Sequence, residues 1–170
     1  TFAKMLKKRL IGVITVLDGW AVQSFGYNKY LPIGRPDVIA KNLDNWGADE
    51  IFIQSIDRSI NNYGPDFKLL NSIMDLSLAT PLTYGGGITS LDNAVEVIKN
   101  GFERIVVDSI LHSEDNNLEE ICYKIGSQAI VGSVPVKVEE NKIYWFDYKN
   151  CKLKGDFNNF KNIINKKMIS

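Results

Sequence analysis

The sequence has few of the residues that mark secreted, disulfide-stabilised or metal-binding proteins. Its 170 residues include only two cysteines, Cys122 and Cys151, and one histidine, His112. Two isolated cysteines give no disulfide framework, and the chain does not start with a signal-peptide pattern, so we expect free thiols in a cytoplasmic protein. A lone histidine without neighbouring ligand-type residues argues against a metal site or a histidine-dependent triad. No metal and no cofactor are predicted.

Net charge and long apolar runs are also missing. Lys plus Arg equals Asp plus Glu at 20 each, which offers neither a basic surface for nucleic acid nor an attraction to acidic lipid. No apolar run reaches the roughly 18 residues of a membrane span. The composition, 45% hydrophobic and 24% charged, is that of an ordinary globular domain. We therefore expect a soluble domain that binds a small molecule or another protein.

What the chain does have is a regular alternation of apolar β-branched runs with segments of helical periodicity. The predicted strands are residues 10–16, 51–56, 80–84, 104–107 and 129–136. The predicted helices follow them, with apolar positions at Val38 to Trp46, Phe67 to Met74, Leu91 to Ile98, Leu118 to Cys122 and Phe157 to Ile164. A polar loop is expected after the first strand, and the aromatic residues 142–149 predict a small β excursion after the fifth.

Strands that alternate with helices predict a parallel sheet, either an open doubly wound sheet or a closed barrel. A (βα)8 barrel needs about 250 residues, so five units would be only part of one. We interpret residues 1–170 as one partial barrel domain, with residues 1–4 as an expression remnant.

A glycine-rich turn is the most specific short motif. Gly85, Gly86 and Gly87 fall between a predicted strand and the helix for which Thr89-x-x-Asp92 is a plausible capping box. Such a turn can bring backbone N–H groups and a helix N-terminus to a phosphate, or it can be a tight turn without a ligand. Its position at the carboxyl end of a strand favours phosphate binding.

Several motifs in one order resemble the cyclase subunit of imidazole glycerol phosphate synthase, the HisF-like family. They are Lys8-Arg9-Leu10-Ile11, Asp18-Gly19, Gly47-Ala48-Asp49-Glu50, Gly85-Gly86-Gly87-Ile88 and Gly126-Ser127-Gln128-Ala129. The similarity covers about Met5 to Lys137. It implies an α/β fold of the (βα)8 TIM-barrel family, of which this chain has the first five βα units.

The resemblance also implies site residues and a partner. Phosphate would bind at Gly86, Gly87 and Ser109. A glutaminase (HisH-like) subunit would deliver ammonia through a ring of charges at the N-terminal mouth, where Arg9, Glu50 and Arg104 stand. The alternative for these three residues is ordinary surface ion pairs, each contributing roughly 0–1 kcal/mol.

The sequence departs from the family at the catalytic positions. The two aspartates that act as general acid and base in the family correspond to Thr15 and Pro135, neither of which can replace a carboxylate. The family's loop lysine corresponds to Gln23 and its second-strand aspartate to Ser55.

Four other residues, each of which follows a predicted strand, are candidates for a modified active site. Asp57 and Asp108 are candidate replacement acids. Arg58 is a candidate anion clamp or, with Asp57, a loop ion pair, and Lys137 could reach the substrate or be a solvated lysine.

Three functions are consistent with this pattern. The first is an ammonia-accepting barrel subunit that acts on a phosphorylated or nucleotide-linked sugar in surface polysaccharide biosynthesis, as in the divergent family members linked to amidino-sugar formation. The second is authentic imidazole glycerol phosphate synthesis in histidine biosynthesis. The third is a non-catalytic partner that binds and activates a glutaminase.

Overall fold

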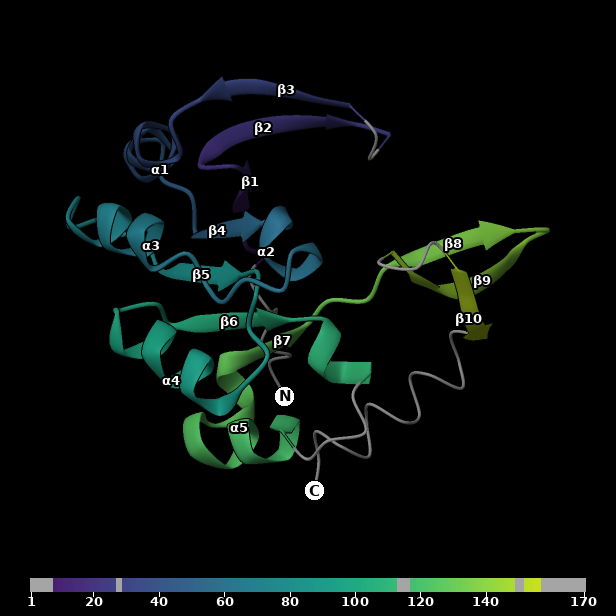
Figure 1. Cartoon of the computed structure of the whole chain (residues 1–170). Helices are drawn as coiled ribbons and strands as arrows, with labels where there is room; N and C mark the ends of the chain where they lie inside the picture. The colour runs from purple at the N-terminus through teal and green to yellow at the C-terminus, as the bar shows by residue number, and fades with distance from the viewer. Residues whose placement is uncertain (1–7, 27–28, 113–116, 149–151, 157–170) are drawn as a thin grey trace, which may run out of the picture.

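The computed structural model of the protein describes residues 8–26, 29–112, 117–148 and 152–156. Its main sheet has seven strands in the order β3-β2-β1-β4-β5-β6-β7 (Figure 1). They are β1 (Ile11–Leu17), β2 (Trp20–Phe25), β3 (Lys29–Gly34), β4 (Glu50–Ser55), β5 (Leu82–Gly85), β6 (Arg104–Val107) and β7 (Ile130–Gly132). Strands β1, β4, β5, β6 and β7 are parallel to one another. The sheet is therefore that of a partial (βα)8 barrel, as predicted.

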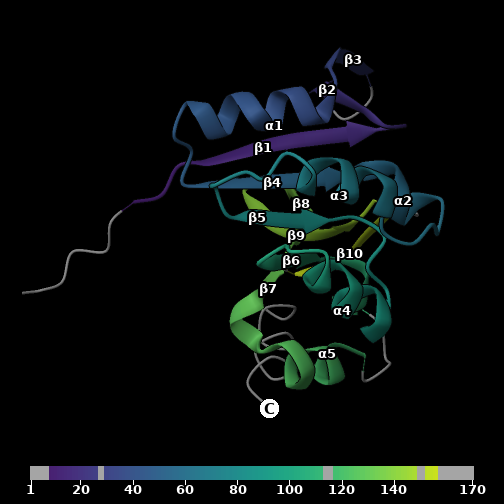
Figure 2. The same ribbon diagram turned by 90° about the vertical axis from the view of Figure 1, so that its left-hand side faces the viewer.

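Helices connect the parallel strands and cover one face of the sheet. They are α1 (Pro36–Asn45), α2 (Ile56–Ile60), α3 (Phe67–Met74), α4 (Leu91–Lys99) and α5 (Asn117–Ile125), with short 3-10 helices η1 (Ser109–His112) and η2 (Ser127–Ala129). Figure 2 looks at the sheet from the side of α1, α3, α4 and α5. The opposite face, which would line the inside of a barrel, carries no helix in the described part of the chain.

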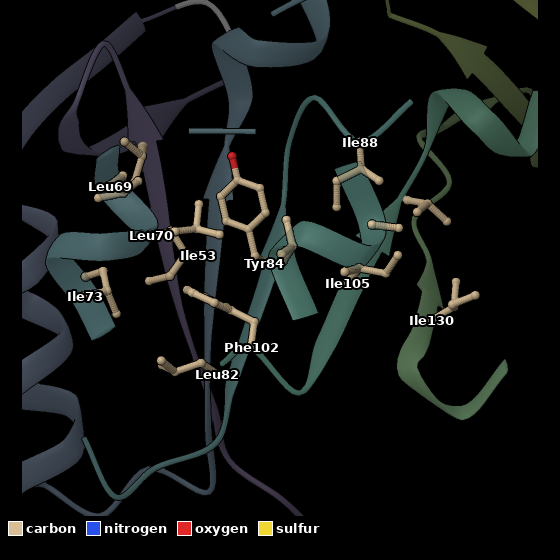
Figure 3. Packing of buried hydrophobic residues seen from close by; sticks show 14 of the residues in the cluster. Ile53, Leu69, Leu70, Ile73, Leu82, Tyr84, Ile88, Phe102, Ile105 and Ile130 are labelled. Atoms are coloured by element: carbon tan, nitrogen blue, oxygen red, sulfur yellow. The ribbon is translucent and has the colours of Figure 1, made fainter. Parts of the chain in front are cut away.

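The hydrophobic core lies between the sheet and these helices. Ile51, Ile53 and Ile105 point from the strands into it and are fully buried. Tyr84 packs edge-on against Phe102, with ring centroids 6.0 Å apart (Figure 3). A Cβ atom on Gly12 would lie 2.7 Å from a methyl carbon of Leu43, so this glycine lets α1 pack closely on β1. Each buried isoleucine contributes about 2 kcal/mol through the hydrophobic effect.

A second sheet of three antiparallel strands follows β7. It comprises β8 (Val136–Glu139), β9 (Lys142–Asp147) and β10 (Lys152–Asp156) in the order β10-β9-β8. In Figure 1 it lies beyond the arrowheads of β4, β5 and β6, at the carboxyl ends of these strands. Trp145 of β9 packs against the main core. The predicted β excursion is confirmed, and it is a complete small sheet.

Several local predictions were wrong. The expected polar loop after β1 is the β2–β3 hairpin, in which Pro32 is accommodated because β3 is an edge strand. The fifth strand ends at Gly132, because the chain then leaves the main sheet for β8. Ser90 rather than Thr89 caps α4, its hydroxyl accepting a hydrogen bond from Asn93 N.

Other predictions concern side chains and the end of the chain. Gly47 takes the left-handed conformation after α1 as predicted, with φ of 77°. Trp46, however, is 77% exposed because it forms the C-cap of α1 and does not reach the core. The helix predicted at residues 157–164, and Cys151, lie outside the described residues.

Candidate functional site at the two ends of the sheet

At the N-terminal ends of the strands, Glu50 is a buried carboxylate held by two arginines. Its Oε2 atom lies 3.0 Å from Arg9 Nη2 and 3.4 Å from Arg104 Nη1. The Thr83 hydroxyl donates a hydrogen bond to Oε1. The Glu50 side chain is 4% exposed, whereas those of Arg9 and Arg104 are 41% and 38% exposed. The structure thus brings together the three residues of the predicted ammonia gate.

The alternation of side chains along each strand explains why these side chains meet. Strands β4, β5 and β6 are neighbours, and Glu50, Thr83 and Arg104 each lie at or near the start of one. Their sequence neighbours Ile51, Leu82 and Ile105 point to the helix side and are buried, so period two directs the polar residues to the helix-free face. Thr83 was not predicted as part of the cluster, although a threonine within an apolar strand was a signal for a buried hydrogen bond.

Asp49 anchors Arg9 and the start of β1 at the same end of the sheet. Arg9 Nη2 donates to Asp49 O at 3.1 Å, and the Leu10 amide donates to Asp49 Oδ2 at 2.7 Å. A carboxylate that is buried between two partly exposed guanidinium groups is not an ordinary surface ion pair, because its desolvation must be offset by both partners.

At the opposite, carboxyl end of the strands, the glycine-rich turn is needed for packing. A Cβ atom on Gly86 would lie 2.3 Å from Ser55 O, and one on Gly87 would lie 2.4 Å from Tyr63 O. Both have positive φ, 133° and 70°. The Gly87 amide donates to Ser59 Oγ at 3.2 Å. The tight-turn reading therefore explains both glycines, and phosphate binding at Gly86 and Gly87 stays a prediction.

Asp57, Arg58 and Asp108 lie at the same carboxyl edge, and Ser109 begins η1 just after β6. Asp57 is on the first turn of α2 and partly exposed. The Arg58 side chain donates to Gly64 O at 2.7 Å and lies over the Tyr63 ring at 5.1 Å. Arg58 thus organises the loop before α3, and its predicted role as an anion clamp has no support in these contacts.

Lys137 is in β8, where its Nζ pairs with Glu139 Oε1 at 2.7 Å. It is thus held by an exposed ion pair on the second sheet.

The positions that depart from the family pattern are spread along this edge. Thr15 is near the end of β1, opposite Gln54 of β4, and Pro135 is in the link between β7 and β8. Gln23 is exposed on the β2–β3 hairpin. Ser55 Oγ is buried next to the Tyr84 hydroxyl, but it has no hydrogen bond of good geometry among the described residues.

The sequence did not point to Tyr148, which follows β9. Its hydroxyl forms hydrogen bonds with the Asp108 carboxylate and the Ser59 hydroxyl. Burial raises the pKa of the Tyr148 phenol, and the charge of Asp108 raises it further. The phenol is therefore protonated near neutral pH and acts as a hydrogen-bond donor.

The described residues contain no group of three or more His, Cys, Asp or Glu side chains placed to hold a metal ion. Among the helices that the structure describes, none has an apolar stretch of the length that a membrane span requires.

Known proteins are similar to this chain over most of its length. The family model described as "Histidine biosynthesis protein" matches residues 9–158. A "Putative imidazole glycerol phosphate synthase subunit hisF2" of Vibrio vulnificus is 32% identical over 146 residues, 86% of this chain and 53% of that protein. The HisF subunit of Exiguobacterium sp. is 29% identical over 144 residues (85% and 56%), and that of Sulfolobus acidocaldarius 30% over 144 (84% and 57%). The chain spans about half the length of these relatives.

Proposed function

Because the chain belongs to the histidine biosynthesis protein family and is HisF-like, we propose that it is the ammonia-accepting barrel subunit of a glutamine-dependent amidotransferase pair. The observation that carries this proposal is the buried Glu50 between Arg9 and Arg104. The cluster lies at the end of the sheet where the resemblance implies a glutaminase (HisH-like) partner. From there, ammonia would enter along the helix-free face.

The chemistry of the cluster suits a gate for a neutral molecule. A buried carboxylate held by two cations would resist the passage of water and free ions, because separating either pair leaves an uncompensated charge. The guanidinium groups are partly exposed, so a docked partner can contact them and shift their positions. Ammonia, which is uncharged and small, can pass between side chains that exclude ammonium.

We propose a phosphorylated or nucleotide-linked sugar of surface polysaccharide biosynthesis as the substrate. The support is the replacement of the two family aspartates by Thr15 and Pro135, which removes the usual acid and base of ring closure. Gly86 and Ser109 are the proposed phosphate contacts. Gly87 contributes its conformation, since its own amide already donates to Ser59.

Imidazole glycerol phosphate synthesis is the second candidate, and the names of the relatives favour it equally. The two candidates differ in what they demand of the carboxyl edge. Ring closure of the histidine-pathway intermediate would have to proceed here without either family aspartate. Growth of cells that lack the cyclase on histidine-free medium therefore separates them, and rescue by this chain would overturn the polysaccharide proposal.

The proposal is tested by coupling to a glutaminase. The full chain is mixed with a HisH-like subunit, and glutamate release from glutamine is measured with and without the chain. We expect stimulation by the wild type and its loss in Glu50→Gln, whereas Glu139→Gln, which breaks the exposed pair of Lys137, leaves it unchanged. No complex and no stimulation would refute the proposal. Stimulation without turnover on any sugar phosphate would indicate the non-catalytic partner.

A further inference from the structure

A chain of hydrogen bonds crosses the carboxyl edge of the sheet and ends on Asp108. The Gly87 amide donates to Ser59 Oγ at 3.2 Å. The hydroxyls of Ser59 and Tyr148 are hydrogen-bonded to each other, and the Tyr148 hydroxyl is hydrogen-bonded to the Asp108 carboxylate. Four groups from the glycine-rich turn, α2, the end of β9 and the end of β6 are thereby connected.

The direction of this chain follows from its carboxylate end. A carboxylate can only accept, so Tyr148 uses its single hydroxyl proton to donate to Asp108. The Tyr148 oxygen is then left as the acceptor for the Ser59 hydroxyl, whose own oxygen accepts from the Gly87 amide. The donors polarise one another in this arrangement, and the charge-assisted bond at the end holds one face of the carboxylate in place.

The second sheet explains how a tyrosine far along the chain reaches this edge. The Phe146 amide donates to Pro135 O at 2.9 Å, and Trp145 of β9 pairs with Val136 of β8 and packs on the main core. Tyr148 follows two residues after Phe146, so these contacts restrict where its ring can lie.

Asp108 is placed to face a ligand on the helix-free side. In β6 the buried residues Ile105 and Val107 point to the helices, and Arg104 points to the other face, where it meets Glu50. Asp108 directly follows Val107, the last residue of β6, and one further step of this alternation would put its side chain on the face of Arg104, at the opposite end of the strand. Asp57, the other candidate acid, is on the first turn of α2, and the described residues give its carboxylate no such donor.

We propose that Asp108 is the proton-accepting group of the site and that Tyr148, backed by Ser59, is its positioning residue. This inference rests on the proposed function, because it assigns the acid–base role that Thr15 and Pro135 cannot perform. The step is one proton transfer: a nitrogen or oxygen atom of the substrate loses its proton, and a carboxylate oxygen of Asp108 gains it. No oxidant or co-reactant is needed.

The hydrogen bond can be tested without a substrate. In full-length protein labelled with ¹³Cζ-tyrosine, the Tyr148 resonance is assigned as the signal lost in Tyr148→Phe. We expect Asp108→Asn to shift this resonance at neutral pH and to lower its alkaline midpoint toward the value of about 10 for a free tyrosine. The matched control, Asp57→Asn, should change neither. A Tyr148 signal that responds equally to both variants, or to neither, would overturn the proposed contact.

Turnover then tests the role of the contact, with ammonium chloride as nitrogen source and the histidine-pathway intermediate and nucleotide-linked sugars as probes. We expect Asp108→Asn to lower kcat by about 100-fold or more and Tyr148→Phe by about tenfold, with KM for the active probe nearly unchanged. Asp57→Asn should retain activity. A wild-type kcat in Asp108→Asn, or an equal loss in Asp57→Asn, would overturn the assignment.

The two tests also separate this inference from the proposed function. If no probe turns over but the Tyr148 resonance responds to Asp108→Asn alone, the contact stands and the assignment of a catalytic role fails. If glutaminase coupling fails while ammonium-driven turnover depends on Asp108, the ammonia-gate proposal fails and the present inference survives.

Discussion

Replacing Glu50 by glutamine should lower the free energy of unfolding. The size of this loss depends on how exposed the two arginine partners of Glu50 are. Removing one member of a fully buried ion pair costs about 3–5 kcal/mol, whereas an exposed pair contributes about 0–1 kcal/mol. Here the carboxylate is 4% exposed, but the two arginine side chains are 41% and 38% exposed and can turn to water. Glutamine also keeps an oxygen for the Thr83 hydroxyl. We therefore expect a loss of about 2 kcal/mol.

Thermal unfolding followed by circular dichroism measures this loss. For a chain of this size about 2 kcal/mol corresponds to a fall in Tm of about 4–8 °C. The matched control is Glu139→Gln, whose salt bridge joins side chains that are 54% and 43% exposed, and its Tm should fall by less than that of Glu50→Gln, at most about 2–4 °C. If both variants unfold at the same temperature, Glu50 is not a buried charge and the physical basis of the gate is wrong.

Three further predictions concern the scaffold. Gly87→Ala should cost at least about 2 kcal/mol more than Gly19→Ala, because both glycines have positive φ but only at Gly87 would a Cβ atom clash with backbone; urea unfolding compares them. Tyr84→Phe leaves the Asp66 amide, 2.9 Å from the lost oxygen, without its acceptor, and we expect about 1–3 kcal/mol lower stability in the same assay. Asp44 accepts hydrogen bonds that lower its pKa, chiefly from the Thr80 hydroxyl and amide, so its contribution is present above pH 4 and disappears as pH falls through the lowered value. The difference in urea midpoint between wild type and Asp44→Ala should therefore be larger at pH 7 than at pH 2, and an equal difference would refute the linkage.

Local patterns predicted the parallel part of the fold because each strand and helix there carries its own signal. Strands β1, β4, β5 and β6 are short apolar runs, and the helices that cover them have apolar residues at helical spacing. The β2–β3 hairpin lacked such a signal, since Pro32 and several exposed residues interrupt any alternation. An edge hairpin tolerates this composition, which is why the segment read as a loop.

The sequence predicted those parts of the candidate site in which each residue is placed by the alternation within its own strand. The positions of Glu50 and Arg104 at strand starts follow from the alternation, so their contact could be anticipated together with the family resemblance. The contact between Asp108 and Tyr148 could not, because it requires the register of β8 and β9 and the docking of Trp145 on the core. Neither is encoded in a local pattern.

The charged cluster at the N-terminal end of the sheet allows its contribution to stability to be measured separately from its contribution to function. A buried ion cluster is often no more stable than apolar residues of similar volume, since the desolvation of the charges offsets their attraction. Replacing Arg9 and Arg104 by methionine together with Glu50→Leu removes the charges but also the acceptor of the buried Thr83 hydroxyl, so we expect the Tm to stay close to that of the wild type, although Glu50→Gln alone lowers it. If the cluster serves only the fold, the triple variant will behave as the wild type in every assay. If it gates ammonia, the triple variant will fold and lose its response to a glutaminase while ammonium-driven turnover remains. A triple variant that is as stable as the wild type but uncoupled would thus show that the charges at this end are maintained for transfer of ammonia and are not required by the core.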